Sequence, residues 1–169
     1  MDANVNIQSS GMNTGNLKEF GIGYVNFVLR QIEDWKDNAK KSYGMEDAIQ
    51  VPVNCDGDRA MMVEYDSNYP FQYWNAGASW IQPIFEMYQC FGNITVNTDF
   101  GDKELLGDIL LPLLRMQTNF WKQLCTPEYF TDTDGNACYL KGKKSLNDGE
   151  KYLIIPSYSP ENHPKGYES

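Results

Sequence analysis

The chain has few groups of the kinds that bind nucleic acid or zinc. It contains one histidine, His163, and only 14 lysine and arginine residues against 23 acidic residues, so its net charge is −9. Nucleic acid requires a clustered basic surface, and this composition argues against such a partner. The four cysteines include no Cys-x-x-Cys pair, which together with the single histidine argues against a zinc site. We expect no metal and no cofactor.

Long apolar runs are also missing. No stretch approaches the roughly 18 apolar residues that indicate a membrane-spanning helix, so we expect no membrane segment. The first residues, Met1 to Asn4, contain neither a basic region nor an apolar stretch and do not form a signal peptide. The 169 residues, 41% of them hydrophobic and 14% aromatic, fit a single globular domain spanning 1–169.

The spacing of apolar residues predicts a mostly α-helical chain with long loops. We expect helices at 16–34, 35–43, 75–91 and from 102 onward, the last divided or bent by Pro112, with short strands at 48–53 and 152–155 and a hairpin around Cys138. The loops between these helices are longer than the about two to eight residues usual in helical bundles. Long loops on a helical scaffold tend to carry function.

The most constrained polar segment is 156–164, in which three prolines fix φ angles. It carries Glu161, Asn162 and His163. A carboxyl group with apolar and aromatic neighbours can have a raised pKa and act as a general acid. His163 shares a face with Glu161 if the segment is extended, and it could bind a substrate hydroxyl. The alternative is a solvated surface loop, and the local sequence alone favours that alternative.

Two further polar and aromatic groups are candidates for ligand binding. Asn4 and Asn6 would share one face of an extended strand, where their amides could bind sugar hydroxyls or orient a water; a frayed N-terminus is the alternative. Aromatic residues, Trp74 among them, concentrate between Tyr65 and Trp80. Aromatic rings suit a carbohydrate cleft because sugars present apolar C–H faces, although core packing explains such rings equally well. The acidic segment 132–136 lacks the EF-hand spacing and is predicted to be a turn.

Taken in order, these segments resemble glycoside hydrolase family 95, the inverting α-L-fucosidases and α-L-galactosidases. Asn4-Val5-Asn6 is similar to the family's Asn-x-Asn strand, and Trp74–Trp80 to its Gly-Gly-Ala-Trp helix. Leu110–Trp121 resembles its Pro-Leu-Leu helix, and Ser159-Pro160-Glu161 its Ser-Pro-Glu acid loop. The segment after Asn6 departs from the family because it lacks the usual Tyr-Trp-Pro.

The resemblance implies a specific fold and mechanism. The fold would be an (α/α)6 toroid, a six-hairpin glycosidase, of which this chain would be an incomplete part. Glu161 would be the general acid, and Asn4 and Asn6 would hold the attacking water. The expected substrate contacts are Trp74, Asn162 and His163. An aspartate outside this chain would complete the catalytic pair, so we expect the chain to be inactive on its own. The implied partner is an oligosaccharide or glycan, and the implied location is secreted or periplasmic.

Two alternatives remain beside the glycoside hydrolase. One is a non-catalytic carbohydrate-binding or interaction module. The other is an α/α-toroid glycoside phosphorylase, which ranks last because no basic phosphate pocket is obvious. In an incomplete toroid the apolar stripe Leu105–Leu124 and the aromatics of Trp74–Phe91 would be exposed, and exposed apolar patches drive association. We therefore expect a homo-oligomer or a rearranged compact helical fold.

Overall fold

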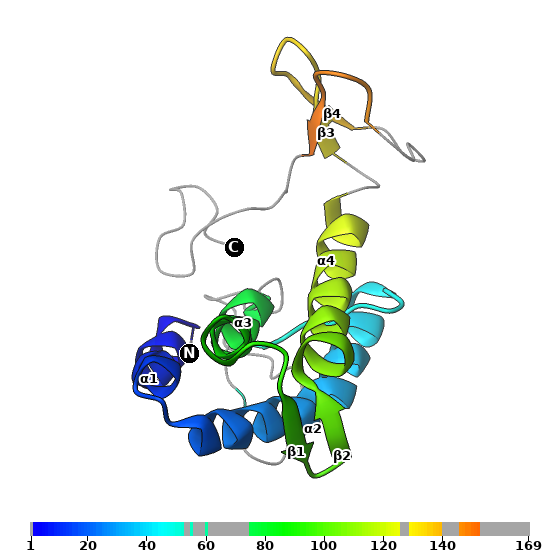
Figure 1. Cartoon of the computed structure of the whole chain (residues 1–169). Helices are drawn as coiled ribbons and strands as arrows, with labels where there is room; N and C mark the ends of the chain where they lie inside the picture. The colour runs from blue at the N-terminus through cyan, green and yellow to red at the C-terminus, as the bar shows by residue number, and fades with distance from the viewer. Residues whose placement is uncertain are drawn as a thin grey trace.

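The computed structural model describes residues 2–52, 55, 60, 75–125, 129–139 and 146–152. This part of the chain is mostly helical, as predicted, and no toroid is evident in it (Figure 1). The helices are α1 (Asp2–Thr14), α2 (Lys18–Tyr43), α3 (Gly77–Phe91), the π-helix η2 (Leu105–Leu110) and α4 (Leu111–Cys125). The strands are β1 (Thr95–Thr98), β2 (Gly101–Glu104), β3 (Tyr129–Thr131), β4 (Ala137–Tyr139) and β5 (Lys151–Tyr152). None of the described helices is long and apolar enough to cross a bilayer.

The helix α2 joins two helices that the sequence analysis expected to be separate. It passes Asp34 and Trp35 without a break, because neither glycine nor proline interrupts the chain there, and Trp35 is fully buried. Its C-terminal end is as predicted: Gly44 has a left-handed φ of 66°, and its N–H donates to the Lys40 carbonyl at 2.8 Å. The predicted start of the first helix is wrong by two residues, since Asn16 lies outside α2 with φ 56°.

The N-terminal strand expected at Asn4 and Asn6 is also wrong, because these residues belong to the helix α1. Successive residues of an α-helix are rotated by about 100° around its axis, so positions 4 and 6 do not share a face. The reason lies in tertiary packing: α1 lies against α3, and Met12 and Asn13 are buried in that contact. The apolar residues of α1 form no amphipathic stripe, so the helix is stabilised there by its neighbour rather than by its own sequence.

The core lies between α2, α3, η2 and α4. Its fully buried side chains include Trp35, Ile84, Met87, Leu105 and Leu113. The expectation that the apolar stripe Leu105–Leu124 would be exposed is therefore wrong for most of its side chains, which are buried. Leu111 and Leu114 are exceptions, at 52% and 39% exposure. The described helices bury most of these apolar side chains against one another. This is the compact helical fold that the sequence analysis gave as the alternative to a homo-oligomer. The homo-oligomer stays a prediction.

The predicted division near Pro112 takes the form of a change in helix type. The segment Leu105–Leu110 is a π-helix, and Pro112 is the second residue of α4. Proline has no N–H to donate to the preceding turn and its ring needs room, and the wider π turn supplies that room. The Leu111 N–H accordingly donates to the Leu106 carbonyl, five residues back.

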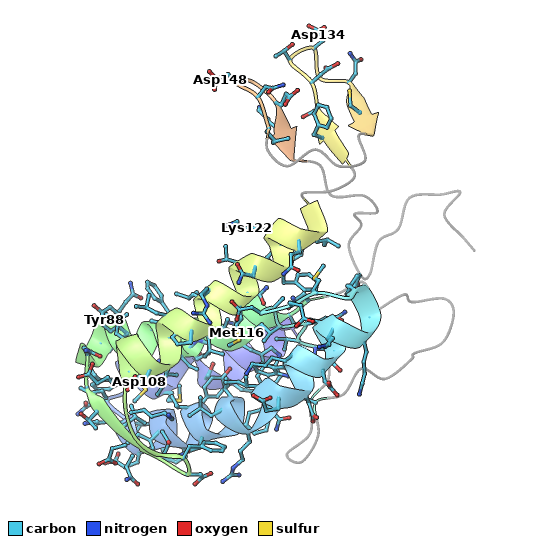
Figure 2. The ribbon with its side chains drawn as sticks, turned by 90° about the vertical axis from the view of Figure 1, so that its right-hand side faces the viewer. Tyr88, Asp108, Met116, Lys122, Asp134 and Asp148 are labelled. Carbon is cyan, nitrogen blue, oxygen red and sulfur yellow. The ribbon has the colours of Figure 1, made fainter. Side chains whose placement is uncertain are left out.

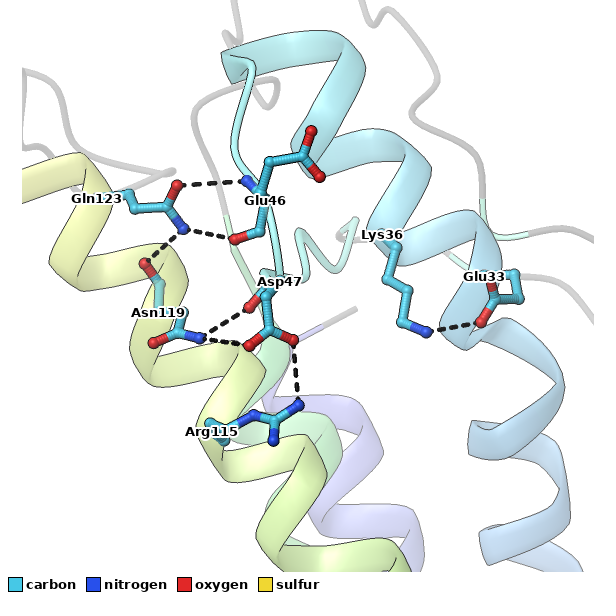
Figure 3. Close-up of polar contacts among 7 residues, drawn as sticks. All are labelled: Glu33, Lys36, Glu46, Asp47, Arg115, Asn119 and Gln123. Carbon is cyan, nitrogen blue, oxygen red and sulfur yellow. Dashed lines mark hydrogen bonds and ion pairs between the residues drawn. The ribbon is translucent and has the colours of Figure 1, made fainter.

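The loop after α2 is fixed by polar side chains of α4, not by strand pairing. The strand expected at 48–53 is absent from its described part, residues 48–52, because the backbone there bonds to helices: Gln50 N–H donates to the Trp35 carbonyl at 3.0 Å. Upstream, Asn119 Nδ2 donates to the carbonyl and carboxylate of Asp47 at 2.9 and 3.0 Å (Figure 3). Asp47 has φ 47°, a conformation that these contacts stabilise.

Two small antiparallel sheets complete the described part. The β1–β2 hairpin, with Thr98 opposite Gly101, was not predicted. In the second sheet β3 pairs with both β4 and β5, which confirms the hairpin near Cys138 and a strand at Tyr152. Figure 2 shows this sheet, with Asp134 and Asp148 at its turns, beyond the end of α4 that Lys122 marks.

Candidate functional site

Most of the predicted site residues cannot be placed. Trp74, Glu161, Asn162 and His163 lie outside the described residues, and of Asn4 the structure describes only its place in α1. The predictions for the acid loop therefore stay predictions. Asn6 is the one residue of the predicted site whose side-chain contacts are defined.

Asn6 fastens α1 to α3. Its Nδ2 donates to Gln82 Oε1 at 2.9 Å and to the Ser79 carbonyl at 3.4 Å. In an unbroken helix the Ser79 carbonyl would accept from the N–H of residue 83, but that residue is Pro83, which has no N–H. Asn6 thus supplies a donor that the proline removes. Asn13 strengthens the same contact, since its Nδ2 donates to the Pro83 carbonyl at 2.9 Å.

The described part of the segment Trp74–Trp80 forms the start of α3, and Asn75 fixes it. Asn75 Nδ2 donates to the Ile49 carbonyl at 2.8 Å, while its Oδ1 accepts from Gly77 N–H at 2.9 Å. Gly77 allows α4 to approach closely: a Cβ at this position would lie 2.0 Å from Gln117 Oε1. Both polar atoms of the Gln117 side chain are buried, and neither has a hydrogen-bond partner among the described residues.

Trp80 lies in the middle of an aromatic cluster. Its ring stacks on Phe27 and Tyr24, with centroids 5.5 and 6.5 Å away and interplanar angles of 18° and 15°. The Tyr24 hydroxyl donates to the Trp80 carbonyl at 2.8 Å. Burial, and secondly the neighbouring Cys55 thiol, raise the pKa of Tyr24 well above its ordinary value, so the phenol stays protonated and acts as a donor. Trp80 is only 6% exposed, and its Nε1 has no hydrogen-bond partner.

A groove of about 970 Å³ opens beside this cluster, between α1, α2 and α3, and it is the best candidate for a binding site. Its wall is mainly apolar and includes four aromatic side chains, Phe20, Tyr24, Phe27 and Trp80. Glu19 is the only charged residue among the described residues that line it. The sequence analysis pointed to the aromatics between Tyr65 and Trp80, so of these four side chains it named only Trp80 as a candidate.

The polar features elsewhere indicate structure. In the turn after β3, Asp132 Oδ1 accepts from the backbone N–H groups of Asn136 and Asp134 at 2.8 and 2.9 Å, and these bonds, chiefly those from Asn136, lower the pKa of the Asp132 carboxyl. This confirms the predicted turn. Among the described residues, no three His, Cys, Asp or Glu side chains gather as metal ligands. Cys90 and Cys138 are free thiols.

Comparisons of the sequence and the fold with protein-family models, curated proteins and solved structures found no match.

Proposed function

We propose that this chain is part of the catalytic domain of an inverting glycoside hydrolase that acts on α-L-fucosides or related α-L-glycosides. The observation that carries the proposal is the ordered series of segments that ends in Ser159-Pro160-Glu161. In the proposal these segments belong to an incomplete (α/α)6 toroid, whose missing helices and base-side aspartate lie outside the 169 residues.

The helical scaffold supports the proposal in two respects. The toroid is built from helical hairpins, and α3 and α4, which are separated in sequence by the β1–β2 hairpin and η2, pack on one another around Gly77. Trp80, the last residue of the Trp74–Trp80 segment, lines a groove with aromatic walls. Such a groove suits the apolar face of a sugar ring.

The proposed chemistry assigns one group to each side of the glycosidic bond. Glu161 donates a proton to the leaving oxygen, and a water held by asparagine carbonyl oxygens attacks from the other side. The contacts of Asn6 with α3 use Nδ2, whereas the proposed water acceptor is Oδ1. Asn4 lies at a different angle on α1, so the chain in this form does not present both amides together. The helix at this position departs from the Asn-x-Asn strand on which the resemblance rests.

The experiment compares the 169-residue chain with the natural gene product, including whatever sequence follows Ser169, on 4-nitrophenyl α-L-fucoside and α-L-galactoside. We expect hydrolysis by the longer protein only. Loss of a general acid typically costs about 10²–10⁴-fold in rate when the leaving group is a poor one, so Glu161→Gln should lose that much on methyl α-L-fucoside, whereas 4-nitrophenolate leaves with little acid assistance. The matched control is Glu33→Gln, at an exposed position on α2. A Glu161→Gln protein as active as the control on methyl α-L-fucoside would refute the assignment.

A non-catalytic carbohydrate-binding module is the second candidate, and the largely apolar groove favours it. In this case the 169-residue chain binds α-L-fucosides without hydrolysing them. Isothermal titration with methyl α-L-fucoside distinguishes the candidates: binding that survives Glu161→Gln, with no hydrolysis by the longer protein, supports the module. Absence of any binding by both proteins would refute it.

A further inference from the structure

The turn between α1 and α2 depends on an asparagine in a left-handed conformation. The Leu17 N–H donates to the Met12 carbonyl at 2.9 Å. The Asn16 N–H donates to the Asn13 carbonyl at 3.1 Å, and together these are the two bonds of a Schellman motif. The motif requires a left-handed residue at the position of Asn16, whose φ is 56°. Glycine is the usual residue there because it adopts this conformation without a steric cost, but the glycine of this turn, Gly15, comes one residue too early.

Asp47 shows how a left-handed residue other than glycine is stabilised elsewhere in the described part of the chain. Asn119 of α4 donates to both its carbonyl and its carboxylate, and Arg115 pairs with the same carboxylate (Figure 3). Asn16 is exposed, and its side chain makes no hydrogen bond with a described residue. Its left-handed backbone is therefore held by its own turn alone.

The start of α2 is a second, independent unfavourable feature of this junction. The N-cap residue is Leu17, whose apolar side chain cannot accept from the first N–H groups of the helix. If α1 continued into α2 as one helix, the carbonyls of the last turn of α1 would accept from these N–H groups. Opening the turn would thus remove both the left-handed asparagine and the uncapped helix start.

The contacts of α1 with α3 do not depend on the turn. Asn6 donates to Gln82 and to the Ser79 carbonyl. Asn13 donates to the Pro83 carbonyl, and α1 packs more extensively on α3 than on α2. A second copy of the chain carries the same α3 surface, so an α1 released from its own chain would form the same contacts there. Only the turn would differ between the two arrangements.

We propose that two copies of this chain associate by exchanging α1. In each copy the hinge, residues 15–17, opens, α1 and α2 join into one helix, and α1 packs on α3 of the other copy. Short hinges that carry strain favour such an exchange. The partner is a second copy of the chain, and the interface is the α1–α3 contact described above. The exchange does not involve Glu161 and is independent of the proposed hydrolase activity.

Two hinge variants should change dimerisation in opposite directions. Asn16→Gly removes the steric cost of the turn and favours the monomer. Gly15→Ala favours the dimer, because in the closed turn its Cβ would lie 2.6 Å from the Gly11 carbonyl oxygen. Each dimer opens two hinges, so we expect the dissociation constant from sedimentation equilibrium to rise at least about tenfold for Asn16→Gly and to fall at least about tenfold for Gly15→Ala. The matched control, Gly23→Ala, adds a Cβ inside α2 with nothing within 4 Å and should leave the constant unchanged.

A crosslinking experiment separates exchange from an ordinary dimer. The Asn6 and Gln82 side chains meet at 2.9 Å. An Asn6→Cys chain and a Gln82→Cys chain are unfolded, refolded together and oxidised, and each refolded alone is the control for the native cysteines. Exchange predicts a disulfide between the two chains that forms less when both also carry Asn16→Gly. A dimer without this disulfide, a dissociation constant unaffected by Asn16→Gly, or a Gly15→Ala protein that stays monomeric would overturn the proposal.

Discussion

Replacing Gly77 by alanine tests the close contact between α3 and α4. The added Cβ would lie 2.0 Å from Oε1 and 2.6 Å from Cδ of Gln117, distances at which something must move. Gln117 is 6% exposed and has little room to turn away. Overpacking of this kind costs about 1–3 kcal/mol, against a gain of up to about 1 kcal/mol from the better helix propensity of alanine. We expect a net loss of about 1–2 kcal/mol in the free energy of unfolding, measured in urea by circular dichroism.

The cause of this loss is tested in a second background. Gln117→Ala removes the opposing amide, so Gly77→Ala should then be neutral or stabilising, and the two substitutions should couple by at least about 1 kcal/mol. Gly23→Ala is the control for helix propensity alone, since nothing lies within 4 Å of its Cβ, and it should stabilise the protein. An equal cost of Gly77→Ala in both backgrounds, or a gain in the wild type, would refute the packing argument.

Three further predictions concern polar contacts. Asn6→Ala should lower the free energy of unfolding by about 1 kcal/mol. The loss should be smaller in a Pro83→Ala background, because the Ser79 carbonyl then regains its helical N–H donor. Equal losses in the two backgrounds would contradict the idea that Asn6 replaces the donor that Pro83 lacks. Asn119→Ala removes two hydrogen bonds to Asp47 and should lower the free energy of unfolding in urea by about 1 kcal/mol. A change smaller than about 0.3 kcal/mol would contradict this expectation. The Asp132 carboxyl should titrate below its ordinary pKa of 3.8 in an NMR experiment. The ionised carboxylate therefore stabilises the turn above pH 3.8, and this stabilisation is lost as the pH falls through the lowered pKa of the folded state. Titration at or above 3.8 would contradict the hydrogen bonds described for this turn.

Features with strong local signals were predictable from the sequence. The ends of α2 and α3 follow from Gly44 and Gly92, which stop the apolar pattern of each helix. The change of helix type before Pro112 follows from the missing N–H of proline. In these cases the residue that determines the structure lies within the element itself.

The features that could not be predicted depend on contacts between distant segments. The helix α1 contains three asparagines and two serines, and its sequence gives no amphipathic pattern. Its packing on α3, which includes contacts of Asn6 and Asn13, appears only in the folded chain. The groove is likewise assembled from three helices. In the sequence, the groove was marked only by Gly11 and Gly23, two glycines that line it and lie inside helices.

The most direct test of the proposed function is the stereochemistry of the reaction of the natural gene product with methyl α-L-fucoside, whose leaving group needs protonation, followed by proton NMR from the first minutes. The inverting mechanism predicts that β-L-fucose forms first, and that Glu161→Gln removes most of the rate. Initial release of α-L-fucose, or hydrolysis that does not depend on Glu161, would contradict the proposed mechanism.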